Sequence, residues 1–128
     1  MIEIHVDGAS KGNHDKTVEN KAYICIIVPD MNLEFIYNKR WLTNNEAEWE
    51  ALLEALKIAI KNKWNKVKIY SDSKLVVEQY NENWKCKNEK MMGYYISAKS
   101  IGDFLDVELV WISRDKNLAG IRLEQKFG

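Results

Sequence analysis

Three acidic residues occupy positions where an unpaired carboxylate is costly. Asp7 and Asp72 each end a segment that predicts a β-strand, and Glu48 shares the apolar stripe of a predicted helix with Leu52 and Leu56. A carboxylate in such a stripe costs free energy unless it is paired or binds a cation. Converging carboxylates repel one another, and hard cations such as Mg²⁺ or Mn²⁺ relieve that repulsion. Two such ions about 3.5–4 Å apart can activate a water molecule and stabilise the leaving oxygen of a phosphodiester.

Each acid also has an ordinary structural explanation. Asp7-Gly8 is a common turn signal, and Glu48 in the first turn of a helix complements the helix dipole. Asp72-Ser73 fits a helix N-cap. The metal-site hypothesis therefore depends on the occurrence of all three acids in one topology.

The N-terminal third of the chain predicts three antiparallel strands. Residues 2–7 alternate between apolar and polar side chains, which is typical of a strand. The apolar run 22–28 and the segment 33–40 predict two further strands, separated by turn residues at 29–32. The polar segment 14–21 predicts a loop. Together these segments predict a three-stranded meander.

A helix is predicted to begin at Thr43, where the periodicity changes. Thr43 and Glu46 fit a capping box, while Asn45 and Glu48 offer a second register for the same motif. The predicted helix has a broad apolar face in which alanines recur at every fourth position. These alanines are Ala47, Ala51, Ala55 and Ala59.

The remaining segments complete a mixed α/β pattern. Strands are predicted over 67–72 and 106–113, and helices over 73–80, 89–105 and the last ten or so residues. The order βββαβααβα, without an internal repeat or a linker, predicts one mixed α/β domain over residues 1–128.

This order suggests where the acids meet. If the first and fourth strands are parallel neighbours, Asp7 and Asp72 lie together at their carboxyl ends. Open α/β sheets bind ligands in the crevice at that edge. The topology thus predicts one site that collects acids from distant parts of the chain.

Composition excludes several classes of protein. The 128 residues include 19 basic and 19 acidic side chains, so nucleic acid would have to bind a local patch rather than a uniformly basic surface. Cys25 and Cys86 do not make a disulfide scaffold, and no apolar run approaches the ~20 residues of a membrane span. The start, Met1–Ile4, is too polar for a signal peptide. We therefore expect a cytoplasmic protein with free thiols and no membrane contact.

Three motifs in succession resemble those of type 1 ribonuclease H. They are Asp7–Asn13 (DGASKGN), Thr43–Glu48 (TNNEAE) and Tyr70–Ser73 (YSDS). The resemblance implies a five-stranded mixed sheet in the order 3-2-1-4-5, with strands 1–3 antiparallel and helices on both faces. It also implies an endoribonuclease that uses Mg²⁺, or Mn²⁺ in its place, to hydrolyse the RNA strand of RNA–DNA hybrids. We expect this protein to be a monomer. The expected products carry 5′-phosphate and 3′-hydroxyl ends.

The resemblance also assigns roles to particular residues. Asp7, Glu48 and Asp72 would be the catalytic metal ligands, and Gly8 and Asn45 would lie near the 2′-hydroxyls that distinguish RNA from DNA. A basic, aromatic connector could contact the hybrid, although it also fits an ordinary solvated segment. The expected substrate-binding residues are Gly8, Asn13, Thr43, Asn45 and Ser73, with Trp84, Lys85 and Lys87 from the connector.

The C-terminal motif departs from the family pattern, which ends in Ala-Asp followed by a leucine. Alignment on Asn117 and Leu123 places Ile121 at the position of the fourth acid. Alignment on Ala119 places Gly120 there instead. Neither alignment supplies the acid that helps to hold a second metal ion.

This departure leaves two functional alternatives open. Glu124, one turn beyond Ile121, is the main candidate to replace the missing acid, with Asp115 and Asn117 as other candidates. The histidine that precedes the last helix in some family members is also missing.

Besides an active nuclease, the sequence fits a weakly active or inactive module that binds RNA–DNA hybrid or duplex RNA. A nuclease of the same fold with another substrate, such as branched DNA, is a further possibility.

Overall fold

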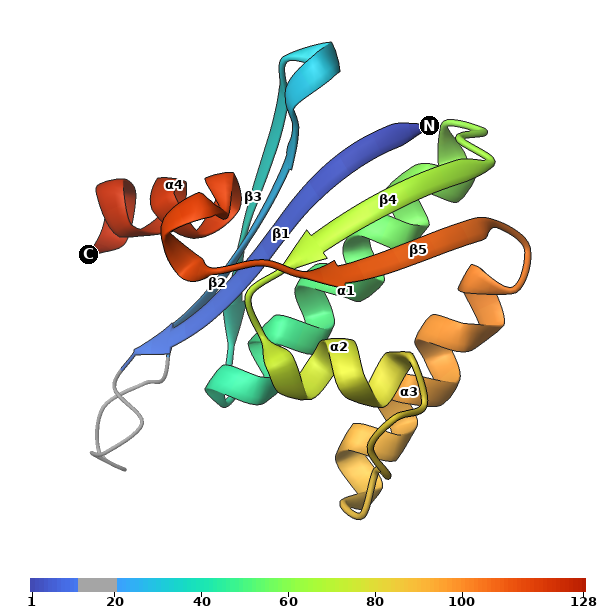
Figure 1. The fold of residues 1–128 in the computed structure, drawn as a ribbon. Helices are drawn as coiled ribbons and strands as arrows, with labels where there is room; N and C mark the ends of the chain where they lie inside the picture. Colours follow the sequence, from blue (N-terminus) through green and yellow to red (C-terminus); the bar gives the residue numbers. More distant parts are fainter. Residues whose placement is uncertain (12–20) are drawn as a thin grey trace.

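The structure is a computed structural model that describes residues 1–11 and 21–128. In these residues a single sheet with the strand order β3-β2-β1-β4-β5 has helices on both faces (Figure 1). The first three strands are antiparallel, and β4 and β5 run parallel to β1. The predicted fold class is therefore confirmed. The strands are β1 (Ile2–Lys11), β2 (Lys21–Val28), β3 (Leu33–Arg40), β4 (Lys66–Ser71) and β5 (Asp106–Trp111).

The helices divide between the two faces of the sheet. The first three, α1, α2 and α3, share one hydrophobic core with the sheet, whereas α4 packs on the opposite face against β1 and β2 (Figure 1). None of the helices in the described ranges is long and apolar enough to span a membrane. Their bounds are α1 (Asn44–Lys61), α2 (Lys74–Tyr80), α3 (Glu89–Gly102) and α4 (Leu118–Phe127), with 3₁₀ turns η1 (Pro29–Met31) and η2 (Arg114–Lys116).

Strand β1 is longer than its sequence pattern predicts. Asp7 lies inside the strand rather than at its end, because antiparallel pairing with β2 continues to Lys11. The parallel ladder to β4, in contrast, stops at Val6 and Ser71. The ladder to β2 therefore overrides the Asp-Gly turn signal. Asp7 remains the first residue beyond the parallel ladder, as a site between β1 and β4 requires.

The start of α1 uses the first of the two predicted capping registers. Thr43 Oγ1 accepts a hydrogen bond from Glu46 N at 3.2 Å, and Glu46 Oε1 accepts one from Thr43 N at 2.8 Å. The second register, which pairs Asn45 with Glu48, is not used. Glu48 is consequently available to point toward β1.

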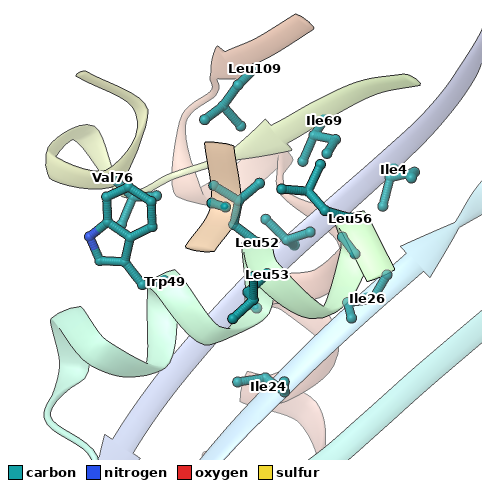
Figure 2. Packing of buried hydrophobic residues seen from close by; sticks show 14 of the residues in the cluster. Ile4, Ile24, Ile26, Trp49, Leu52, Leu53, Leu56, Ile69, Val76 and Leu109 are labelled. Atoms are coloured by element: carbon teal, nitrogen blue, oxygen red, sulfur yellow. The ribbon is translucent and has the colours of Figure 1, made fainter. Parts of the chain in front are cut away.

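The core between α1 and the sheet fixes the position of Glu48. Leu52 and Leu56 of α1 are fully buried against Ile4 of β1 and Ile69 of β4 (Figure 2). Burial of each such side chain contributes about 1.5–3 kcal/mol. Since Glu48 lies one turn before Leu52, this packing presses its side chain toward the end of the β1–β4 ladder.

Other predicted boundaries also differ from the structure. Strand β4 ends at Ser71, so Asp72 follows the strand rather than ending it. Helix α3 ends at Gly102 rather than at residue 105, and β5 ends at Trp111 rather than at residue 113. A Cβ at Gly102 would lie 2.2 Å from Tyr80 Oη, so a larger residue there would have to displace the Tyr80 side chain of α2. Of the predicted loop 14–21, only Lys21, which begins β2, lies within the described residues.

Helix α1 approaches β1 most closely at Gly8. A Cβ at this position would lie 2.2 Å from Ala47 O and 2.7 Å from Glu48 N. Any side chain at Gly8 would therefore force the helix away from the strand.

We expect Gly8→Ala to lower the free energy of unfolding by about 1–3 kcal/mol, because overpacking displaces α1. Urea unfolding measures the loss. The matched control is Gly93→Ala in α3, where an added Cβ meets nothing within 4 Å. This control should leave the protein as stable as, or up to about 1 kcal/mol more stable than, the parent. Equal stability of Gly8→Ala and the parent would contradict the close approach.

Candidate metal centre and active site

Three carboxylates from three different elements converge at one edge of the sheet. Asp7 comes from β1, Glu48 from α1, and Asp72 from the residue that follows β4. One carboxylate oxygen of each lies within 4.8 Å of the others. Asp7 is buried, and the other two are partly exposed. The structure therefore brings together the three acids that the sequence singled out.

Glu48 is oriented by the strand that carries Asp7. The backbone N–H of Gly8 donates a hydrogen bond to Glu48 Oε1 at 2.7 Å. Glycine at this position thus permits the approach of α1 and supplies a donor that fixes one oxygen of Glu48.

Asp72 is held by Trp111, at the end of β5, and by Asn117, which follows η2. Asn117 is fully buried, and its Nδ2 donates to Asp72 Oδ2 and to Val6 O, both at 2.9 Å. Asn117 Oδ1 also caps α4 by accepting from Ala119 N. Trp111 Nε1 donates to the main-chain oxygen of Asp72 at 3.1 Å. Asn117, considered above as a substitute ligand, therefore acts here as a donor that positions Asp72.

Burial and mutual repulsion raise the pKa values of two of these acids. Burial, followed by the charge of Asp72, raises the pKa of Asp7 to about 7, although the Arg114 charge and the Gly8 N–H oppose this shift. Burial, then the charges of Asp7 and Asp72, raises the pKa of Glu48 well above its ordinary value. Three carboxylate oxygens form a donor set that suits a hard divalent cation. A bound cation would offset the repulsion that raises both pKa values.

The carboxylates open onto a polar cleft of about 350 Å³. One wall is the second half of β1 with the start of α1, and the other is η2 with α4. This cleft is large enough to admit part of a ligand beside the acids. Its lining includes Gly8, Ser10, Lys11, Asn44, Asn45 and Arg114.

The other predicted substrate contacts are distributed unevenly around this cleft. Gly8 and Asn45 line it. Thr43 caps α1, and Ser73 caps α2 by accepting from the helix backbone at 3.2 Å, so both have structural roles. Asn13 lies outside the described residues.

The connector residues do not line the acidic cleft. Trp84 and Lys85 line a separate cavity of about 330 Å³ beside α2 and α3, and Lys87 lines a third hollow. Their contact with a substrate therefore stays a prediction.

The helix α4 faces the acids with its backbone. A Cβ at Gly120 would lie 3.2 Å from Asp72 Oδ2 and 3.5 Å from Asp7 Oδ2. Ile121 is exposed and lines an adjoining hollow instead. Glu124 lines the cleft but does not belong to the close group of three carboxylates in the part of the chain that the structure describes. The structure thus brings Gly120 against the acids, and the assignment of Ile121 to the fourth acidic position stays a prediction.

Sequence reasoning missed several residues that the cleft contains. Arg114, in η2, lines the cleft, and its positive charge lowers the pKa of Asp7. Asn44 Oδ1 accepts a hydrogen bond from Ser10 N at 2.8 Å, which ties the start of α1 to β1. Ser10 and Asn44 belong to the first two motifs that resemble ribonuclease H, so their proximity to Asp7 and Glu48 in the sequence was an available signal. Arg114 lies outside those motifs and had no such signal.

The metal-free protein should lose stability as the pH rises. Between the ordinary aspartate pKa of 3.8 and about 7, folded Asp7 binds more protons than unfolded Asp7, so the free energy of unfolding falls with increasing pH. Asp7→Asn removes the contribution of Asp7 to this dependence. In EDTA we expect it to raise Tm by about 4 °C or more at pH 8, and by less at pH 5.

The exposed Asp106→Asn on β5 controls for the loss of one negative charge. Thermal unfolding at both pH values provides the comparison. An equal change in Tm at pH 5 and pH 8 for Asp7→Asn would contradict the repulsion inferred at this site.

Comparisons with known proteins identify the family of the chain. The model of the reverse transcriptase-like family matches residues 10–123. EbsB of Enterococcus faecalis (strain ATCC 700802 / V583) is 32% identical over 130 residues, which cover 98% of this chain and 93% of EbsB. Bifunctional protein Rv2228c of Mycobacterium tuberculosis (strain ATCC 25618 / H37Rv) is 29% identical over 127 residues, or 95% of this chain. The match covers 34% of Rv2228c, so the chain spans about a third of that relative.

Solved structures agree with this assignment. LC11-RNase H1, in complex with an RNA/DNA hybrid, has a TM-score of 0.82 and 26% identity over 96% of this chain and 93% of its own. The N-terminal RNase H domain of Rv2228c has a TM-score of 0.77 and is 27% identical, and the match covers 95% of this chain and 94% of that domain's chain. RNase H1 of Halobacterium salinarum NRC-1 shares the fold, with a TM-score of 0.80 and 23% identity. That match covers 95% of this chain and 92% of the other. The chain therefore belongs to the reverse transcriptase-like family and is a ribonuclease H-like domain.

Proposed function

We propose that this domain is an endoribonuclease that hydrolyses the RNA strand of RNA–DNA hybrids with Mg²⁺ or Mn²⁺. The observation that carries the proposal is the convergence of the Asp7, Glu48 and Asp72 carboxylates in an open polar cleft. LC11-RNase H1, a similar structure, was solved with an RNA/DNA hybrid. The expected products carry 5′-phosphate and 3′-hydroxyl ends.

The three acids fit the role of metal ligands. Divalent ions bound there would activate the attacking water and stabilise the leaving 3′ oxygen, as in two-metal-ion catalysis. The chain itself positions the ligands, because Gly8 N–H fixes Glu48 and the Asn117 amide fixes Asp72.

The walls of the cleft suit an RNA-containing substrate. Lys11 and Arg114 supply positive charge for backbone phosphates, although the chain as a whole has no net charge. The exposed amide of Asn45 can donate to and accept from a 2′-hydroxyl, the group that marks RNA. Local chemistry rather than net charge would therefore select the substrate.

A cleavage assay on labelled RNA–DNA hybrid, duplex DNA, duplex RNA and branched DNA tests the proposal. We expect cleavage of the RNA strand of the hybrid with Mg²⁺ or Mn²⁺. Asp7→Asn and Asp72→Asn should lower the rate at least about 100-fold, because each removes a ligand charge. Glu108→Gln on the exposed edge of β5 is the matched control and should retain activity. Intact hybrid after incubation with folded protein and either metal would reject the nuclease.

A weakly active or inactive module that binds hybrid or duplex RNA is the second candidate function. The observation that favours it is the absence of an acid at Gly120 and Ile121 of α4. This candidate predicts hybrid affinity well above that for duplex DNA, together with slow cleavage. A large gain in rate from Ile121→Asp would show that the native centre lacks a ligand, whereas fast cleavage by the parent protein would exclude this candidate.

A further inference from the structure

Trp41 is an exposed aromatic residue that the protein core does not use. Its side chain is 66% exposed, at the connection between β3 and α1. Its φ is 64°, in the left-handed region that bulky L-residues rarely adopt. The other non-glycine residues with positive φ in the described ranges are Asn32, Lys63 and Glu82, all of them polar. An apolar ring is thus held in water by a disfavoured backbone, an arrangement that often marks a binding function.

The connection that carries Trp41 is fastened to the wall of the acidic cleft. Ser10 Oγ donates to Leu42 O, and Ser10 N donates to Asn44 Oδ1 at 2.8 Å. Thr43, the residue after Leu42, is fixed in turn by its capping box with Glu46. Ser10 and Asn44 line the cleft, so the connection that carries Trp41 borders the cleft wall and forms its rim.

A row of positive charges lies beside this rim. Lys11 of β1 is opposite Lys21 of β2, which in turn is opposite Arg40 of β3. Directly opposed residues in antiparallel strands share one face, and like charges in that arrangement are unfavourable. Lys11 donates a hydrogen bond to Phe127 O and also lines the cleft. The rim therefore combines an aromatic ring with a basic row, a pair of features suited to a nucleic-acid backbone.

We propose that Trp41 is a substrate-binding residue that packs against sugars of the duplex outside the scissile position, while the Lys11–Lys21–Arg40 row faces the adjacent phosphates. The inference rests on the proposed function. Lys11 lies four residues beyond Asp7 on β1, which corresponds to about 13 Å. Since a duplex rises about 3.4 Å per nucleotide, this separation corresponds to the length of about four nucleotides, which places the basic row outside the scissile position.

Steady-state cleavage of two hybrids tests this inference. One hybrid extends at least eight base pairs to each side of the cut, and the other extends two. Trp41→Ala should raise KM about 5- to 20-fold on the long hybrid with kcat unchanged, and it should leave KM on the short hybrid unchanged. Trp41→Phe, which keeps an aromatic ring, should restore most of the affinity.

Two further variants separate contact from folding. Trp41→Gly relieves the strained φ, so it should raise Tm. It should also raise KM on the long hybrid as much as Trp41→Ala does. Phe104→Ala removes another exposed ring, 81% exposed between α3 and β5, and should leave KM unchanged. An unchanged KM on the long hybrid for both Trp41→Ala and Trp41→Gly would overturn this inference alone. A parent protein that neither binds nor cleaves hybrid would overturn the proposed function and this inference together.

Discussion

The mutual repulsion of three carboxylates is the constraint on which the rest of this site depends. Asp7, Glu48 and Asp72 offer oxygens within 4.8 Å of one another, and two of the three have raised pKa values in the absence of a cation. Like charges this close together move apart unless the surrounding structure holds them in place. The fold must therefore supply enough packing and hydrogen bonding to keep the cluster together.

That support comes mainly from β1, which belongs to two different ladders. Its parallel pairing with β4 ends at Val6, and its antiparallel pairing with β2 continues past Asp7 to Lys11. The first ladder brings Asp72 alongside, and the second holds the backbone of Asp7 and Gly8 in place. Close contact between Gly8 and α1 then brings Glu48 against the same strand.

Much of this arrangement could be predicted from the sequence, because it depends on local patterns. The alternation of β1, the capping box of α1 and the three acidic motifs each occupy a few neighbouring residues. The full length of β1 could not be predicted, since pairing with β2 overrides a local turn signal. The roles of Arg114 and Gly120 depend on how η2 and α4 dock against β1, which no local pattern determines.

Helix α4 shows how the site differs from one with four acids. It presents the Gly120 backbone to the cluster, and the Asn117 at its N-cap donates to Asp72. Three carboxylates must therefore be sufficient to hold a divalent cation at this site.

Isothermal titration calorimetry of Mn²⁺ into metal-free protein at pH 8 tests that requirement directly. We expect saturable binding by the parent protein, and loss of that binding in Asp72→Asn with the fold retained. Equal Mn²⁺ affinity in the two proteins, or no binding by the folded parent, would contradict it.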